Sequence, residues 1–100
     1  MYDMKNLAKL KRMADLAPEG WSTFEAFDQA AYQGGAIPAK YKELMAVAVA
    51  LTTQCPYCIA IHSKKAKQAG ATEQEIAETA LVAAAIRAGG AITHATHALE

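Results

Sequence analysis

Cys55 and Cys58 are the two cysteines of this 100-residue sequence, and two residues separate them in the stretch TTQCPYCIAIHSKKAK. His62 follows four residues after the second cysteine. Two neighbouring thiols can close a short disulfide that a partner thiol reopens, and an adjacent imidazole can take up or return a proton. The same residue types also bind metal ions, so the pattern leaves redox chemistry, zinc binding and a structural role open.

The spacing of these three side chains predicts that they share one face of a helix. Residues three and four apart are neighbours on a helix surface, and Pro56 suits a first helical turn. We therefore expect the cysteines at the N-terminal end of a helix, with His62 one turn further on. The helix dipole and free backbone N–H groups at such an end stabilise a thiolate. This placement favours a reactive pair over two inert core thiols.

Glu43 is a further candidate site residue, because it directly precedes the apolar run LMAVAVAL, where a carboxylate is costly unless it has a partner. It lies about three helical turns before TTQC, and His62 lies about two turns after it. Two antiparallel helices joined there would bring the two side chains together as a proton relay behind the sulfurs. The alternative is an exposed carboxylate beside Lys40 and Lys42, and spacing alone does not decide between them.

Metal binding is the competing interpretation of the cysteine pair. Zinc sites usually hold four ligands, and Cys55, Cys58 and His62 supply three at most. His94 and His97 lie much further from the cysteines than the ligands of common zinc modules, at a spacing typical of a surface helical tail. We therefore predict neither a metal nor another cofactor at this site.

Apolar residues recur at helical spacing along the chain, alanine is abundant, and no segment alternates as a strand would. This pattern predicts an all-α helical bundle of about five to six helices, formed as a single domain over residues 1–100. The helices are expected over residues 3–16, 21–33, 38–53, 55–69 and 72–87, with a short helical tail after them.

Several residues mark the expected helix boundaries. Gly70 is suited to terminate the fourth helix, and Thr72 with Glu75 forms a capping box at the start of the fifth. Gly89 and Gly90 are expected to end the fifth helix. The third helix becomes apolar on all sides, so we expect it in the middle of the bundle.

Composition argues against several classes of partner. Ten basic and ten acidic residues give a formal net charge of zero, which provides no broad basic field for nucleic acid or an anionic membrane. The N-terminus does not resemble a signal peptide, and the longest uncharged apolar run is too short to span a bilayer. We expect a cytoplasmic protein. Leu99 and Glu100 have the sequence of a cloning remnant and are given no functional weight.

Glu43, the pair Cys55 and Cys58, and His62 together resemble the signature of the AhpD-like alkylhydroperoxidases, within the carboxymuconolactone decarboxylase superfamily. The stretch CPYCIAIHSKKAKQAGATEQEIAE is similar to that family throughout, and the likeness extends over residues 38–87. The resemblance implies an all-α fold completed by assembly into a homotrimer or homohexamer. It also implies a dihydrolipoyl or other dithiol donor and a partner peroxiredoxin.

The same resemblance implies a role for each site residue. Cys58 would attack the peroxide and pass through sulfenic acid, and Cys55 would donate a proton and then resolve the intermediate into a disulfide. Glu43 and His62 would form the proton relay.

Two features depart from the best-known members of that family. Tyr57 replaces a histidine between the cysteines, and tyrosine is a poor proton shuttle at neutral pH. The chain also resembles one half of those longer proteins, so oligomerisation is expected to cover its apolar segments 45–51 and 81–86. We predict a thiol-dependent oxidoreductase that reduces peroxides or disulfides. The alternatives are a carboxymuconolactone decarboxylase-type enzyme, whose chemistry does not call for a CxxC pair, and a non-catalytic metal-binding or structural module.

Overall fold

The computed structural model describes residues 2–99, and all regular secondary structure in that range is helical. The elements in chain order are the 3-10 helix η1 (Met4–Lys9), α1 (Leu10–Leu16), α2 (Pro18–Tyr32), α3 (Ala39–Thr53), α4 (Pro56–Gln68), α5 (Glu73–His94) and the 3-10 helix η2 (Ala95–Leu99). The predicted all-α class is confirmed. Glu100, which the sequence assigns to a cloning remnant, lies outside the described residues.

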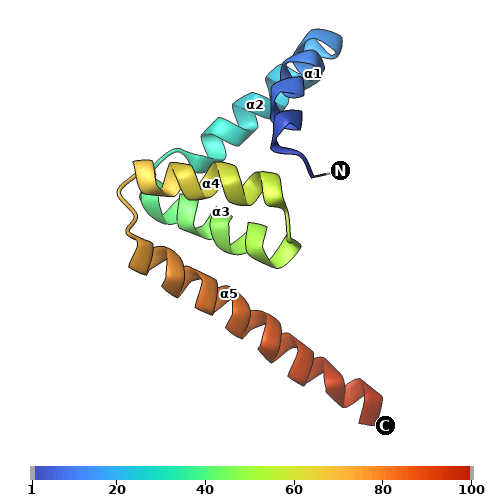
Figure 1. Ribbon diagram of the computed structural model, residues 1–100, viewed down its shortest axis with the longest axis vertical. Helices are drawn as coiled ribbons and strands as arrows, with labels where there is room; N and C mark the ends of the chain where they lie inside the picture. The colour runs from blue at the N-terminus through green and yellow to red at the C-terminus, as the bar shows by residue number, and fades with distance from the viewer. Residues whose placement is uncertain (1, 100) are drawn as a thin grey trace.

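Helix α3 is the centre of the molecule. Helices α3 and α4 form an antiparallel hairpin, and the first half of α5 packs against α3 before the rest of α5 continues away from the body (Figure 1). Val47 of α3 is the most buried large side chain, at 1% exposure. The buried cluster around it comprises Leu44, Val47, Ala66 and Ala71, with Leu51 and Ile76 packed against it.

The α3–α4 hairpin depends on a connection of two residues. Gln54 adopts the left-handed conformation, with φ at 56°, and its N–H bonds the carbonyl of Ala50 to close α3. Cys55 then takes an extended conformation as the N-cap of α4. Because the chain reverses within these two residues, the last turn of α3 and the first turn of α4 lie next to each other. At the other end of α4, Gly70 adopts a positive φ of 99°, as its predicted terminator role requires.

The start of α5 forms as predicted, but its end does not. Thr72 and Glu75 make both hydrogen bonds of a capping box. Helix α5 continues through Gly89 and Gly90 to His94, so the predicted break at these glycines is wrong. A glycine costs about 1 kcal/mol in a helix interior, and the flanking alanine-rich sequence with no proline tolerates that cost.

The N-terminal boundaries also differ from the prediction. The expected helix over residues 3–16 is divided, because its first half adopts the tighter 3-10 form and α-helix begins at Leu10. Asp3 caps that first half by accepting a hydrogen bond from the N–H of Lys5. Helix α2 begins at Pro18, three residues earlier than expected, because proline is well suited to a first turn.

A single chain leaves much apolar surface exposed. Its radius of gyration is 16.6 Å, against about 13 Å for a compact domain of this length. Its accessible surface is 7605 Å², whereas a folded protein of 10.6 kDa exposes roughly 5,500 Å². The exposed large apolar residues of α5 and its extension are Leu81, Val82, Ile86, Ile92 and Leu99.

The sequence led us to expect that helix α3 is buried on every side, and this prediction is wrong for the single chain. It packs against α4 and α5, but Met45 and Val49 on its other side are 53% and 60% exposed. The helical segment Glu73–Leu99 is long and apolar enough to cross a membrane, and 6% of its most apolar window is buried within this single chain. Length and composition alone are weak support for a span, because the core helix of a soluble protein meets the same criteria.

Candidate functional site

Both cysteines lie at the N-terminal end of α4, as predicted. Cys55 is the N-cap residue, and its Sγ accepts a hydrogen bond of 3.3 Å from the backbone N–H of Cys58. The two sulfurs are joined in a disulfide, and the two Cα atoms are 5.3 Å apart. The pair therefore stands where backbone N–H groups and the helix dipole stabilise a thiolate after reduction.

Glu43 and His62 contact each other across the α3–α4 interface. Glu43 Oε2 lies 2.7 Å from His62 Nδ1, and Glu43 is only 7% exposed. The exposed-carboxylate alternative for Glu43 is therefore wrong. A buried carboxylate needs such a partner, and an ionised Glu43 accepts a hydrogen bond from Nδ1–H. That bond leaves Nε2 as the ring nitrogen able to exchange a proton.

Tyr32, at the end of α2, is a site residue that the sequence did not indicate. Its ring lies 4.8 Å from the His62 ring, centroid to centroid, with the two planes tilted by 31°. Burial raises the pKa of the Tyr32 hydroxyl, and the carboxylates of Asp28 and Glu43 raise it further. The hydroxyl therefore stays protonated at neutral pH. Tyr32 gave no signal in the sequence because its contact depends on how the α2–α3 connection folds.

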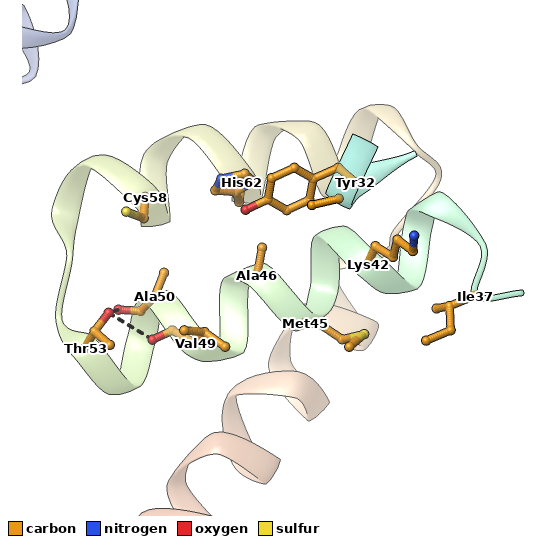
Figure 2. Close-up of a pocket in the computed structure, with 11 residues that line it drawn as sticks. Tyr32, Ile37, Lys42, Met45, Ala46, Val49, Ala50, Thr53, Cys58 and His62 are labelled. Atoms are coloured by element: carbon orange, nitrogen blue, oxygen red, sulfur yellow. Dashed lines mark hydrogen bonds between the residues drawn. The ribbon is translucent and has the colours of Figure 1, made fainter. Parts of the chain in front are cut away.

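A pocket of about 380 Å³ lies beside the cysteines. Cys58, His62 and Tyr32 line it, and its remaining walls are mostly apolar (Figure 2). Cys55 and Glu43 are not among its lining residues. The pocket therefore distinguishes the two sulfurs, because Cys58 lines it and Cys55 does not.

Tyr57, between the cysteines, is held by the N-terminal segment. Asn6 Nδ2 donates a 2.9 Å hydrogen bond to the Tyr57 hydroxyl, and the Tyr2 ring lies 5.9 Å from the Tyr57 ring. Tyr57 is not among the residues that line the pocket. Tyr57 thus contacts η1 and Tyr2, which lies just before that helix.

His94 and His97 do not join the cysteine site. Their rings lie 5.4 Å apart at the end of α5 and in η2, well away from α4 (Figure 1). Within residues 2–99, no group of three or more His, Cys, Asp or Glu side chains is arranged to hold a metal ion.

Comparison with known proteins places this site in a family context. Residues 18–100 match the carboxymuconolactone decarboxylase family. The chain is 47% identical over 76 residues to the Paracoccus denitrificans "uncharacterized protein 4 in cox locus", a match covering 76% of this chain and 68% of that protein. It is 42% identical over 83 residues to an uncharacterized protein of Haemophilus influenzae, covering 83% of this chain and 74% of the other.

Two solved structures share the fold. One is a carboxymuconolactone decarboxylase family protein from Legionella pneumophila, 35% identical, with a TM-score of 0.80 over 95% of this chain and 85% of the other. The second, from Methanobacterium thermoautotrophicum, is 35% identical with a TM-score of 0.81, over 88% and 99% of the two chains. On these matches, the chain belongs to the carboxymuconolactone decarboxylase family.

Proposed function

We propose that the protein is a thiol-dependent oxidoreductase of the AhpD-like type, which reduces organic peroxides or disulfides at Cys58. The observation that carries the proposal is the position of Cys58. It opens onto a largely apolar pocket next to His62, and it is bonded to the cysteine that could resolve it. Family membership supports the fold and the arrangement, and the identity of the reaction rests on this geometry.

For a peroxide, the reaction has two steps in the protein. The thiolate of Cys58 attacks the distal oxygen, so that an S–O bond forms, the O–O bond breaks and the alcohol leaves with a proton delivered by the His62–Glu43 pair. Cys55 then attacks the Cys58 sulfur, which forms the S–S bond and releases water. A dithiol donor supplies two electrons and two protons to regenerate both thiols.

The same site can act on a disulfide substrate. The thiolate of Cys58 attacks one sulfur of that substrate to form a mixed disulfide and release the first thiol. Cys55 then attacks Cys58, closing the protein disulfide and releasing the second thiol. Disulfide reduction depends less than peroxide reduction on a proton shuttle between the two cysteines. It therefore tolerates Tyr57 in place of the histidine found there in the best-known AhpD-like proteins. The family description favours a decarboxylase-type reaction, but none of the contacts described at this site supports it.

We also infer that the chain functions as a homo-oligomer, a trimer or hexamer. The monomer exposes about 2,000 Å² more surface than a compact protein of its mass, and a standard interface buries about 800 Å² per partner. Leu81, Val82 and Ile86 contribute exposed apolar surface on α5, and a second copy of the same helix is the simplest cover for them. We place the protein in the cytoplasm, with a dihydrolipoyl or other dithiol donor and a peroxiredoxin as candidate partners.

The test is consumption of an organic hydroperoxide with a dithiol as electron donor, and reduction of a small disulfide in parallel. The wild type is expected to turn over at least one of these substrates, and Cys58→Ser is expected to lose that activity. Lys64→Ala is the matched control, because Lys64 is an exposed residue of the same helix. Equal activity in Cys58→Ser and Lys64→Ala would overturn the proposal.

A further inference from the structure

The pocket beside Cys58 has polar groups at both ends and a mostly apolar lining. Cys58 and Thr53 lie at one end, His62 and Tyr32 lie in the middle, and Lys42 lies toward the other end (Figure 2). The other lining residues are apolar, namely Ala31, Ile37, Met45, Ala46, Val49 and Ala50. A binding site of this kind selects a ligand with an apolar body and a polar group at each end.

The lining residues of α3 set the direction in which such a ligand lies. Lys42, Met45, Ala46, Val49 and Thr53 recur at intervals of three and four, so they occupy one face of the helix. Lys42 and Ala50, the residue drawn below Cys58 in Figure 2, are eight positions apart, which corresponds to about 12 Å along the helix. That distance suits an extended alkyl chain of medium length.

The Lys42 ammonium group is positioned to receive an anion. Its Nζ donates a 2.7 Å hydrogen bond to the backbone carbonyl of Gln33, which fixes it between the end of α2 and the first turn of α3. An ammonium group has three donors, so that bond leaves donors for a ligand. Within residues 2–99, no carboxylate lies within ion-pair distance of Lys42, whereas neighbouring Lys40 is paired with Glu75.

We propose that the pocket binds a carboxylate-terminated apolar chain, with the carboxylate at Lys42 and the oxidised group at Cys58. For a hydroperoxide group at the Cys58 end, the inference rests on the proposed function. The carboxylate subsite at Lys42 stands independently of it. Charge complementarity chooses a carboxylic acid over a neutral alkyl compound of the same length, because the neutral compound leaves the Lys42 charge without a partner.

The first test measures binding without chemistry. Octanoate and 1-octanol are titrated calorimetrically into the wild type, Lys42→Met and Lys64→Met. We expect the wild type and Lys64→Met to bind octanoate roughly five- to ten-fold more tightly than 1-octanol, and Lys42→Met to lose that preference. Increasing ionic strength should reduce the preference in the wild type, which tests the subsite even if Lys42→Met fails to fold. Equal affinity of the wild type for octanoate and 1-octanol would overturn the proposal, as would an equal loss of octanoate affinity in Lys42→Met and Lys64→Met. Binding of neither probe to the wild type, as expected if a second copy closes the pocket, would overturn it too.

The second test uses turnover. A hydroperoxide with a terminal carboxylate is compared with its methyl ester, and Lys42→Met should raise KM for the acid alone and leave kcat unchanged. Binding selectivity without turnover of either hydroperoxide would refute peroxide reduction at Cys58 and keep the subsite. Turnover of both compounds with equal KM would refute the subsite and keep the function.

Discussion

Glu43 Oε2 and His62 Nδ1 are 2.7 Å apart, although the two residues belong to different helices and lie nineteen positions apart. The contact gives the buried carboxylate its partner and fixes the orientation of the imidazole beside Cys58. Two structural features produce it, namely the two-residue turn that begins at Gln54 and the antiparallel packing of α3 on α4.

Glu43→Gln should separate the charge of this pair from its shape. Glutamine keeps the volume and a hydrogen bond to His62, but it cannot stabilise a protonated imidazole. We expect kcat/KM for the peroxide or disulfide substrate to fall about 100-fold, and the free energy of unfolding to fall by no more than about 2 kcal/mol. The measurements are steady-state kinetics and denaturant unfolding. Glu78→Gln, at an exposed position of α5, is the control. An unchanged kcat/KM in Glu43→Gln would remove the proton relay from the account.

Tyr32 should act through its ring and not through its hydroxyl. Its raised pKa keeps it protonated, so Tyr32→Phe should retain wild-type kinetics and an unchanged pH profile between pH 6 and 9, since the hydroxyl titrates above about pH 10. Tyr32→Ala removes the ring that packs on His62, an interaction of about 0.5–1.5 kcal/mol. That corresponds to a loss of about two- to ten-fold in kcat/KM. If the phenylalanine variant is as impaired as the alanine variant, the hydroxyl takes part in the chemistry.

The ion pair between Lys40 and Glu75, at 2.9 Å, links α3 to the first turn of α5 and should make stability depend on pH. The backbone N–H of Thr72 and then the Lys40 ammonium lower the pKa of Glu75 below its ordinary value of 4.5. A lowered pKa contributes stability above pH 4.5 that is lost as the pH falls through the folded-state value. The melting temperature of the wild type should therefore fall more steeply in acid than that of Glu75→Gln, which keeps the capping box.

The corresponding control for acid is Glu73→Gln, an exposed carboxylate of the same turn, which should follow the wild type. In alkali the sign reverses. The hydrogen bond to Glu75 raises the pKa of Lys40 above 10.5, so its contribution is present below that pH and is lost as the pH rises through the raised value. Parallel curves for the wild type and Glu75→Gln in acid would show that the pair has no effect on stability.

The exposed apolar side chains of Leu81, Val82 and Ile86 on α5 predict self-association. Ile86 is 71% exposed, and a charge there would be buried without a partner between two copies. Sedimentation equilibrium should give the wild type a mass several times 10.6 kDa, and Ile86→Asp should shift it toward the monomer. Gln74→Asp introduces the same charge at an exposed polar position of the helix and should leave the mass unchanged. A wild-type mass of 10.6 kDa at every concentration would refute the oligomer.

Local signals predicted the parts of the structure that short-range chemistry determines. The capping box at Thr72, the terminator at Gly70 and the cysteines at the start of α4 all formed as expected. The contact of Glu43 with His62 could be proposed from helical spacing, since the turn between α3 and α4 is short.

Features that depend on contacts between distant parts of the chain could not be predicted from the sequence pattern. Tyr32 reaches the site through the connection between α2 and α3, whose path the sequence pattern does not specify. The passage of α5 through Gly89 and Gly90 depends on the balance between a glycine penalty and the propensity of the surrounding alanines, and spacing rules do not weigh the two.

We propose that Cys58 is the attacking sulfur and Cys55 the resolving one. The most direct measurement treats reduced Cys55→Ser and Cys58→Ser with organic hydroperoxide and traps sulfenic acid with dimedone before mass spectrometry. Because Cys58 faces the pocket beside His62, we expect a rapid dimedone adduct on Cys58 in Cys55→Ser and little or none on Cys55 in Cys58→Ser. An adduct that forms on Cys55 as fast as on Cys58, or on neither, would contradict it.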